Sequence, residues 1–367
     1  MIKVCHLTSV HKSHDVRIFQ KECTSIATAG YQVTLIAVNC CSEYKNNVNI
    51  IGIESAKINN RLIRMLSTTI KVYRKALETK SDIYHIHDPE LLPFALKLKK
   101  RGAKVIYDAH EDVPLQILSK YWINKHLRRI VSNIFRQYEN YAAKNLSFIV
   151  AATPSIRNRF LHKNPNTIDI NNYPILSEFP TAPQWDIKKN EICYAGGITK
   201  ERGIGVLIDA LELTNNIYLN LAGEYAQKEF RSELRSKKGW RKVNEYGFVK
   251  REMVNKLLEK SKIGMATFQP EPNHVESQPN KIFEYMNAGI PVIASNFPLW
   301  KRLIEDNNCG VCVNSESAKE IADAIGFLLS NDNAKNMGAN GMALVQSKYN
   351  WNIEKQKLFT VYNQLCG

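Results

Sequence analysis

Two glutamates separated by seven residues, Glu276 and Glu284, enclose the segment of this chain whose residue types are best suited to chemistry. Asn280 and Lys281 lie between them. A carboxylate accepts two hydrogen bonds from neighbouring hydroxyls, as on a sugar ring, and a lysine ammonium pairs with an anion. One glutamate on each side of an anion site therefore suits a ligand with a sugar on both sides of a diphosphate. The alternative is two surface carboxylates on an ordinary helix.

A short helix over residues 280–288 is expected to hold these groups. Pro279 suits the first helical position, where its missing N–H costs nothing, and Gly289 indicates the end. The N-terminus of such a helix presents free N–H groups and partial positive charge, which favours a phosphate. At 100° per residue, Lys281 and Glu284 fall on one side, and we expect this charged side to face away from the core.

The rest of the chain alternates apolar runs of strand length with amphipathic stretches, which is typical of α/β proteins with parallel sheets and helical crossovers. We expect strands at 2–8, 32–38, 83–87, 104–110 and 148–153, and again at 192–195, 217–222, 243–247, 263–268, 291–295 and 311–314. Between the two sets, the chain over 171–190 carries three prolines and shows no periodicity.

This break predicts two domains. We expect a doubly wound, Rossmann-like N-terminal domain over 1–170, a linker over 171–190, a second Rossmann-like domain over 191–348 and a terminal segment over 349–367. Ligands of such folds bind beyond the carboxyl ends of the strands, so the two domains should face each other across a cleft and site residues should follow strands.

Several polar residues do follow expected strands. Gly196 and Gly197 end one strand and would let a phosphate approach the backbone, with Arg202 as a donor close by, although tight turns also need glycine. His110 ends another strand, where a catalytic histidine competes with a structural one. The candidates on the acceptor side, from the first loop and a further strand end, are His14, Asp15, Arg17, His87 and Asp88.

The Glu276–Glu284 pair followed by AGIPVIAS resembles the signature of family 4 retaining glycosyltransferases, which have the GT-B fold. The resemblance covers nearly the full length, and it implies that the last helix crosses back onto the N-terminal domain. It also implies that Glu276 contacts the donor hexose, that Glu284 contacts the nucleotide ribose, and that His110 lies near the donor sugar and reacting phosphate. Gly197 stands where the family usually has an arginine, and we hypothesise that Lys281 replaces the lost charge.

The resemblance further implies transfer of a hexose or N-acetylhexosamine from a nucleoside-diphosphate sugar to a glycan acceptor, as in polysaccharide or O-antigen assembly. Arg202, Lys281 and a helix N-terminus would hold the leaving diphosphate, so no metal and no cofactor are expected. The sequence has no Asp-x-Asp motif, which argues against a metal-dependent GT-A enzyme. A nucleotide-sugar epimerase of the same fold is the main alternative.

The positive charge is uneven. Residues 1–185 contain 26 Lys and Arg against 14 Asp and Glu, whereas 186–367 contain 24 against 21. The basic residues gather at 57–80 and 120–144, where apolar residues are interspersed. Such stretches suit an anionic membrane surface that carries a polyprenyl-diphosphate-linked acceptor, or they are solvated crossover helices. Nucleic-acid binding is not expected, because no recognition helix, zinc finger or aromatic-basic sheet motif is present.

The expected location is cytoplasmic, peripheral on the inner face of the plasma membrane. No apolar run reaches the length of about 18 residues that a membrane span requires, and the first residues read as a strand rather than a signal peptide. The eight cysteines are scattered, which favours reduced thiols over a disulfide framework.

Overall fold

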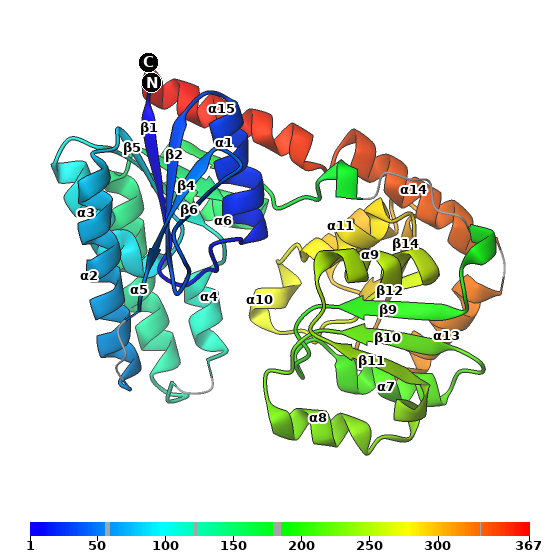
Figure 1. Cartoon of the computed structure of the whole chain (residues 1–367). Helices are drawn as coiled ribbons and strands as arrows, with labels where there is room; N and C mark the ends of the chain where they lie inside the picture. Colours follow the sequence, from blue (N-terminus) through cyan, green and yellow to red (C-terminus); the bar gives the residue numbers. More distant parts are fainter. Residues whose placement is uncertain (56–58, 121–122, 179–184, 331) are drawn as a thin grey trace. The chain divides into compact units, whose positions relative to one another are not determined.

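The computed structural model describes residues 1–55, 59–120, 123–178, 185–330 and 332–367, which form two compact units (Figure 1). Unit 1 comprises Met1–Asn172 and Trp351–Gly367, and unit 2 comprises Tyr173–Asn350. The chain leaves unit 1 after Asn172, within the expected linker 171–190. Residues 179–184 of that linker lie outside the described residues, and its described part contains the short helical turns Leu176–Glu178 (η3) and Trp185–Ile187 (η4).

Unit 1 is built on an eight-stranded sheet in the order β3-β4-β2-β1-β5-β6-β7-β8. Its neighbouring strands are parallel except for β3 and β4. The strands are β1 (Lys3–Leu7), β2 (Gln32–Val38), β3 (Glu43–Lys45), β4 (Val48–Ile53), β5 (Ile83–Ile86), β6 (Lys104–Ala109), β7 (Phe148–Ala151) and β8 (Thr167–Asp169). The sequence pattern missed β3, β4 and β8, because β3 and β8 have only three residues each and β4 is buried only in part.

All helices of unit 1 except the C-terminal one lie between these strands in the sequence, as parallel pairing requires. They are η1 (Val16–Cys23), α1 (Thr24–Thr28), α2 (Arg61–Thr79), η2 (Pro89–Leu91), α3 (Leu92–Lys100), α4 (Val113–Leu118), α5 (Arg128–Asn145), α6 (Pro154–Leu161) and the C-terminal α15 (Trp351–Cys366). The terminal helix α15 packs on η1, and Trp351 Nε1 donates a hydrogen bond of 3.0 Å to Ser25 Oγ. Residues far apart in sequence therefore build one core here.

Unit 2 contains a six-stranded parallel sheet in the order β11-β10-β9-β12-β13-β14. All six strands were expected from the sequence. They are β9 (Glu191–Ala195), β10 (Tyr218–Ala222), β11 (Val243–Gly247), β12 (Ile263–Ala266), β13 (Val292–Ser295) and β14 (Gly310–Val313). The helical elements are α7 (Ile204–Glu212), α8 (Lys228–Arg235), η5 (Lys238–Lys242), α9 (Arg251–Lys260), α10 (Pro272–Val275), α11 (Asn280–Asn287), α12 (Pro298–Ile304), α13 (Ala318–Leu329) and α14 (Asn333–Ser347).

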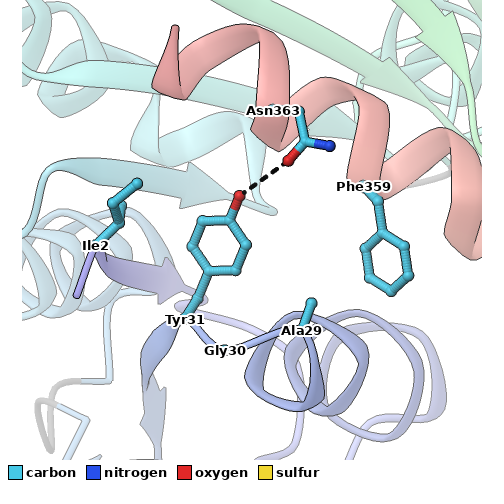
Figure 2. Close-up of a pocket in the computed structure, with 6 residues that line it drawn as sticks. All are labelled: Ile2, Ala29, Gly30, Tyr31, Phe359 and Asn363. Carbon is cyan, nitrogen blue, oxygen red and sulfur yellow. Dashed lines mark hydrogen bonds between the residues drawn. The ribbon is translucent and has the colours of Figure 1, made fainter.

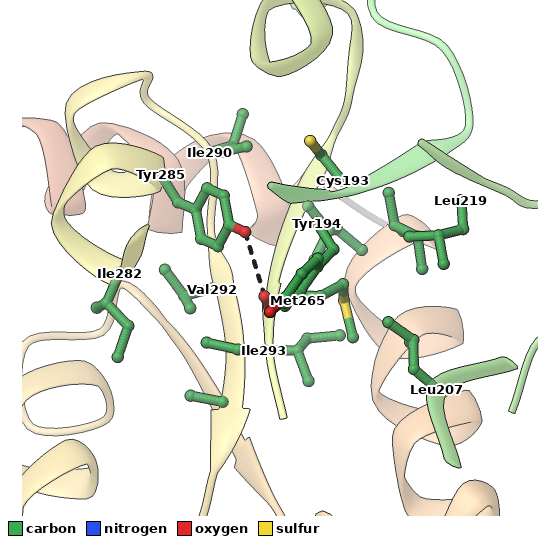
Figure 3. Close-up of a cluster of buried hydrophobic side chains, with 14 of the residues drawn as sticks. Cys193, Tyr194, Leu207, Leu219, Met265, Ile282, Tyr285, Ile290, Val292 and Ile293 are labelled. Atoms are coloured by element: carbon green, nitrogen blue, oxygen red, sulfur yellow. Dashed lines mark hydrogen bonds between the residues drawn. The ribbon is translucent and has the colours of Figure 1, made fainter. Parts of the chain in front are cut away.

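Helix α11 packs directly on strand β12. Tyr285 from α11 points into the cluster of buried side chains in Figure 3, where its hydroxyl donates a 3.2 Å hydrogen bond to the carbonyl of Met265. A Cβ at Gly264 would lie 2.2 Å from the Tyr285 ring, so only glycine allows this approach. The core thereby fixes the height of α11 over the sheet, and with it the position of the two residues that were expected to bind a ligand, Lys281 and Glu284.

The structure corrects the expected helix in two respects. Pro279 is not the first helical residue; it precedes Asn280 as the N-cap, with ψ at 129°, an extended conformation. Lys281 does not face solvent with Glu284, because its side chain is buried and only 8% exposed. The first turn of α11 is covered by aromatic side chains, and periodicity alone could not indicate that cover.

Candidate active site

The buried ammonium of Lys281 lies between two aromatic rings in unit 2. Its Nζ is 3.6 Å from the centroid of the Tyr194 ring and 4.9 Å from that of Phe268. Ring faces attract cations, which partly offsets the cost of removing the charge from water. Burial and the nearby charge of Arg202 nevertheless hold the pKa of Lys281 well below its ordinary value, against the opposing effect of Glu284. An anionic ligand would raise the pKa of this lysine again.

Gly196 and Arg202 lie beside the same cation. A Cβ at Gly196 would stand 3.0 Å from Lys281 Nζ, and the φ of +138° at Gly196 also disfavours other residues. The guanidinium carbon of Arg202 lies 4.1 Å from the centroid of the Phe268 ring. Arg202 and Lys281 therefore share the Phe268 ring, and Gly196 adjoins Lys281, with the backbone of Gly196 and Gly197 exposed. Two cations next to an open backbone form an anion cradle.

Glu284, one turn along α11, is held by an arginine that the sequence did not single out. Arg251 Nη1 donates to Glu284 Oε1 at 2.9 Å, and Arg251 Nη2 donates to Glu178 Oε2 at 2.7 Å. Burial lowers the pKa of Arg251, but the two carboxylates outweigh it and raise the pKa. Arg251 begins α9 shortly after strand β11, so the rule that site residues follow strands was the signal that could have found it.

Glu276 and Asn280 are exposed. Glu276 caps the C-terminal end of α10, and within the described residues its carboxylate has no hydrogen-bond or ion-pair partner. Asn280 is the first residue of α11. Both side chains are thus accessible to a ligand that approaches the N-terminus of α11, although the free protein does not bring Glu276 into contact with Lys281 or Glu284.

In unit 1, His110 follows β6 with 16% of its side chain exposed. Its Nε2 lies 2.7 Å from Asp108 Oδ2. Arg17 holds the same carboxylate, with Nε donating to Oδ2 at 2.9 Å and Nη2 to Oδ1 at 2.7 Å. Burial raises the pKa of Asp108, but Arg17 and the bonds from His110 and His87 outweigh it, so the pKa lies well below its ordinary value. Asp108 is therefore a buried anion.

Three acceptor-side candidates are not placed as expected. Arg17 is only 4% exposed and is bound by Asp108 and the Ile170 carbonyl, so it is a buried partner rather than an exposed contact for an acceptor. His14 is paired with a residue outside the candidate site, because its Nε2 lies 2.6 Å from Glu43 Oε1. Asp15 caps η1 by accepting hydrogen bonds from the backbone N–H groups of residues 17 and 18.

The side chains of His87 and Asp88 are both buried, each 2% exposed. In unit 1, sequence reasoning also missed His11, whose Nε2 lies 3.4 Å from Asp88 Oδ1 and whose ring centroid lies 5.0 Å from that of His110. Burial lowers the pKa of His11, but its hydrogen bond with Asp15 and the charge of Asp88 outweigh it and raise the pKa. His11 is thus a partly exposed ring close to His110, and it is more readily protonated than an ordinary histidine.

A buried set of ligand atoms lies deeper in unit 1, on His6, Glu22, His85 and His87. Three histidines and a glutamate have the chemistry of a transition-metal site. Here, however, both ring nitrogens of His6 already have hydrogen-bond partners, and Arg17 Nε lies 3.1 Å from Glu22 Oε1. A metal ion would have to displace the hydrogen bonds of His6, and it would be repelled by the guanidinium of Arg17. These residues therefore do not fit a metal ion.

Two family models match the chain over most of its length. The model of the "Glycosyltransferase Family 4" domain matches residues 20–170, and that of "Glycosyl transferases group 1" matches residues 177–343. The chain belongs to the family 4 type of glycosyltransferases. His110 falls within the first match, and the anion cradle and both glutamates fall within the second.

Curated relatives of this glycosyltransferase act on different acceptors. A phosphatidyl-myo-inositol mannosyltransferase of Mycobacterium leprae is 22% identical over 311 residues, which cover 81% of this chain and 77% of that one. A chitobiosyldiphosphodolichol beta-mannosyltransferase of Candida albicans is 22% identical over 367 residues, covering 86% and 76%. The Anabaena protein HepE, solved with UDP-glucose, shares the fold with a TM-score of 0.74 at 15% identity, over 99% of this chain and 100% of its own.

The two Rossmann-like α/β units of this glycosyltransferase are those of the GT-B fold. In the part of the chain that the structure describes, no helix is both long and apolar enough to cross a membrane.

Proposed function

We propose that this enzyme is a retaining glycosyltransferase that moves a hexose or N-acetylhexosamine from a nucleoside-diphosphate sugar to a lipid-linked glycan acceptor in cell-surface polysaccharide synthesis. The observation that carries the donor part is the convergence of Lys281 and Arg202 on the Phe268 ring, with the exposed backbone of Gly196 beside Lys281. Two neighbouring cations, one buried and one half-buried, favour a ligand of at least two negative charges, as a diphosphate supplies. The Anabaena structure with UDP-glucose supports the same class of donor.

The proposed reaction breaks the bond between C1 of the sugar and the diphosphate oxygen, and the electron pair leaves with the diphosphate. The acceptor hydroxyl attacks C1 from the same face, and its proton passes to the departing phosphate oxygen. Lys281, Arg202 and the N–H groups at the start of α11 stabilise the charge that develops there. These groups supply the stabilisation without a metal ion, and we propose a metal-independent reaction.

The two glutamates position the sugars. Oε1 of Glu284 is held by Arg251, so its second oxygen is the one we assign to the ribose hydroxyls. Glu276, exposed and unpartnered among the described residues, is assigned to the hexose. The family resemblance adds His110 as a further contact to the hexose. No enzymic nucleophile is required in this scheme.

The proposal of a lipid-linked acceptor is supported by the surface of two helices in unit 1. Helix α5 and its N-cap residue Leu127 expose an apolar stripe at helical spacing, formed by Leu127, Ile130, Val131 and Ile134. Helix α2 exposes a second apolar stripe, formed by Leu62, Ile63, Leu66 and Ile70. Exposed basic residues adjoin both stripes, among them Arg64, Lys71, Lys125 and Arg129. An apolar stripe flanked by cations suits a shallow position in an anionic membrane surface, and the two mannosyltransferases named above carry a lipid in the name of their acceptor.

A screen of UDP- and GDP-sugars for slow donor hydrolysis tests the proposal. We expect one donor to be hydrolysed, in the presence of a chelator, with release of a sugar of unchanged anomeric configuration. Release of the opposite anomer would show an inverting enzyme, and an epimerised sugar would show the epimerase alternative. Binding of no nucleoside diphosphate in calorimetry would overturn the donor site itself.

A further inference from the structure

The buried histidines of unit 1 form one continuous chain of hydrogen bonds that ends at His110. Starting from α15, the Tyr362 hydroxyl lies 2.9 Å from His85 Nδ1 and 3.1 Å from His6 Nε2. His6 Nδ1 lies 2.9 Å from His87 Nε2. His87 Nδ1 then lies 3.2 Å from Asp108 Oδ2, the oxygen that also contacts His110. His87 Nδ1 also lies 3.3 Å from His110 Nε2, but both nitrogens lie closer to Asp108 Oδ2 than to each other.

The direction of this chain follows from its anionic end. Asp108 is ionised and can only accept, so Nδ1 of His87 and Nε2 of His110 must both donate to it. A neutral His87 then accepts at Nε2, which requires His6 to donate from Nδ1. Burial, with the neighbouring histidine charges, lowers the pKa of His6 and His85 well below the ordinary value and that of His87 to about 4, so all three rings are neutral.

The donor and acceptor roles at the Tyr362 end of the chain of hydrogen bonds follow in the same way. Because His6 donates from Nδ1, its Nε2 accepts the hydroxyl proton of Tyr362. The Tyr362 oxygen accepts from His85 Nδ1–H, and His85 Nε2 remains a buried lone pair without a hydrogen-bond partner, 4.0 Å from Glu22 Oε2. This lone pair faces the Glu22 carboxyl, whose pKa is raised well above its ordinary value by burial and by the charge of Asp108, against the lowering effect of Arg17.

At the other end, the chain leaves one nitrogen of His110 for a ligand. Within the described residues no hydrogen bond ends on Nδ1 of His110, and this atom is accessible to solvent. We propose that Asp108, backed by the chain from His87 through His6 to Tyr362, is a positioning residue that fixes His110 as its Nε2–H tautomer, so that Nδ1 accepts a hydrogen bond from a substrate hydroxyl.

This proposal deepens the proposed function and rests on it for the identity of the hydroxyl, which belongs to the donor sugar or the acceptor. The tautomers themselves rest only on the geometry of unit 1. In water the Nε2–H tautomer of histidine is the favoured one, so three buried Nδ1–H rings beside one Nε2–H ring would be an unusual and recognisable pattern.

Nuclear magnetic resonance of the full chain with ¹⁵N-labelled imidazoles measures this pattern directly, because protonated and unprotonated ring nitrogens have very different shifts. At neutral pH we expect His6, His85 and His87 to carry the proton on Nδ1 and His110 to carry it on Nε2. A cationic or Nε2–H ring at His6 or His87, or an Nδ1–H ring at His110, would overturn the proposal. So would stoichiometric zinc in the purified protein that is lost in His85→Gln.

Tyr362→Phe cuts the chain at the end remote from Asp108. If the direction is set by Asp108, His6 and His87 keep their tautomers in this variant, while His85 is released and takes the Nε2–H form facing Glu22. The matched control is Tyr31→Phe. The Tyr31 ring packs on that of Tyr362, but the Tyr31 hydroxyl lies 3.4 Å from Asn363 Oδ1 and is not part of the chain of hydrogen bonds (Figure 2). A switch of His87 in Tyr362→Phe would contradict the assigned direction.

Asp108→Asn tests the consequence for turnover. We expect the nucleotide Kd, which depends on residues of unit 2, to stay unchanged, while kcat for donor hydrolysis or transfer falls by about 10² or more because His110 loses its fixed tautomer. Normal kcat with a released His110 would refute the acceptor role of Nδ1. If this variant does not fold, the wild-type and Tyr362→Phe spectra still decide. If no nucleotide sugar is turned over by the wild type, the proposed function fails, while the tautomers are still tested.

Discussion

Arg251 Nη1 donates a 2.9 Å hydrogen bond to Glu284 Oε1, so one oxygen of the glutamate assigned to the ribose is occupied and fixed in the free enzyme. Pre-orientation of this kind lowers the entropy lost on binding. It also means that the ribose site depends on a residue 33 positions earlier in the chain.

Replacing Glu284 and replacing Glu276 should therefore have different effects, the first on nucleotide affinity and the second on turnover. Glu284→Ala removes the acceptor of the ribose hydroxyls and should weaken binding of the bare nucleoside diphosphate by about 10- to 100-fold, since a hydrogen bond to a charged group contributes about 1.5–3 kcal/mol. Glu276→Ala should leave that affinity nearly intact and abolish turnover. Calorimetry with nucleoside diphosphates and a hydrolysis assay measure both, with the exposed Glu316→Ala as control. The reverse pattern would exchange the two assignments.

The cradle residues should affect the reaction more than the ground state. Lys281→Met, which keeps a long buried side chain without the charge, and Arg202→Ala should each lower kcat by about 10² or more, because donors aimed at a developing phosphate charge contribute a few kcal/mol. Lys301→Met, an exposed lysine of the same unit, is the matched control. A near-normal rate in either variant with the cognate donor would place that residue away from the diphosphate.

The sequence predicted the fold well because alternating strands and crossovers leave a local signal. Every strand of unit 2 was expected at nearly its observed bounds, whereas β3 and β8 are too short to show a pattern. The cradle residues Gly196 and Arg202 could be selected because they follow a strand.

The remaining parts of the site depend on contacts that the sequence does not display. Arg17 pairs with Asp108, 91 positions away, and this separation hides that Arg17 is buried. His11 meets His110 only through the fold of the first loop. Lys281 was placed on the wrong side because helical periodicity classes a lysine as solvent-facing, whereas the rings of Tyr194 and Phe268 accommodate it in the core.

Binding of a nucleoside diphosphate should be coupled to proton uptake. The pKa of Lys281 is well below its ordinary value in the free protein, and a bound diphosphate raises it by supplying an opposite charge. Between these two pKa values the complex holds more protons than the free enzyme, so affinity falls as pH rises through that window. The unbound protein has the opposite linkage: a lowered lysine pKa makes folding less favourable as pH falls below the unfolded value.

Calorimetry in buffers of different ionisation enthalpy measures the protons taken up. Uptake should be present in the wild type within this window and absent in Lys281→Met, while Lys301→Met retains it. Equal uptake in the wild type and Lys281→Met would assign the proton to another group and separate Lys281 from the ligand.

Membrane binding by unit 1 should require both anionic lipid and the apolar stripe of α5. The structure refines which residues to change. Arg128 donates from Nε to the Ile123 carbonyl at 2.9 Å and is therefore partly structural, whereas Lys125 and Arg129 are exposed. Trp122, an aromatic residue of the basic stretch 120–144, lies outside the described residues. The exposed Ile130 and Ile134 are the better candidates for insertion, since each buried apolar side chain adds about 1.5–3 kcal/mol.

Co-sedimentation with vesicles of anionic and of neutral lipid, at low and high salt, measures this binding. Each basic residue near an anionic surface contributes about 1 kcal/mol within a Debye length of about 8–10 Å, so Lys125→Glu/Arg129→Glu should lower partitioning by about 30-fold or more and high salt should lower it further. Ile130→Glu/Ile134→Glu should weaken it at both salt concentrations, because hydrophobic insertion is not screened. Lys228→Glu/Arg241→Glu makes the same change of charge on exposed residues of unit 2 and should have little effect. Equal retention on neutral and anionic vesicles, or none on either, would leave the basic residues as a solvated face and favour a soluble acceptor.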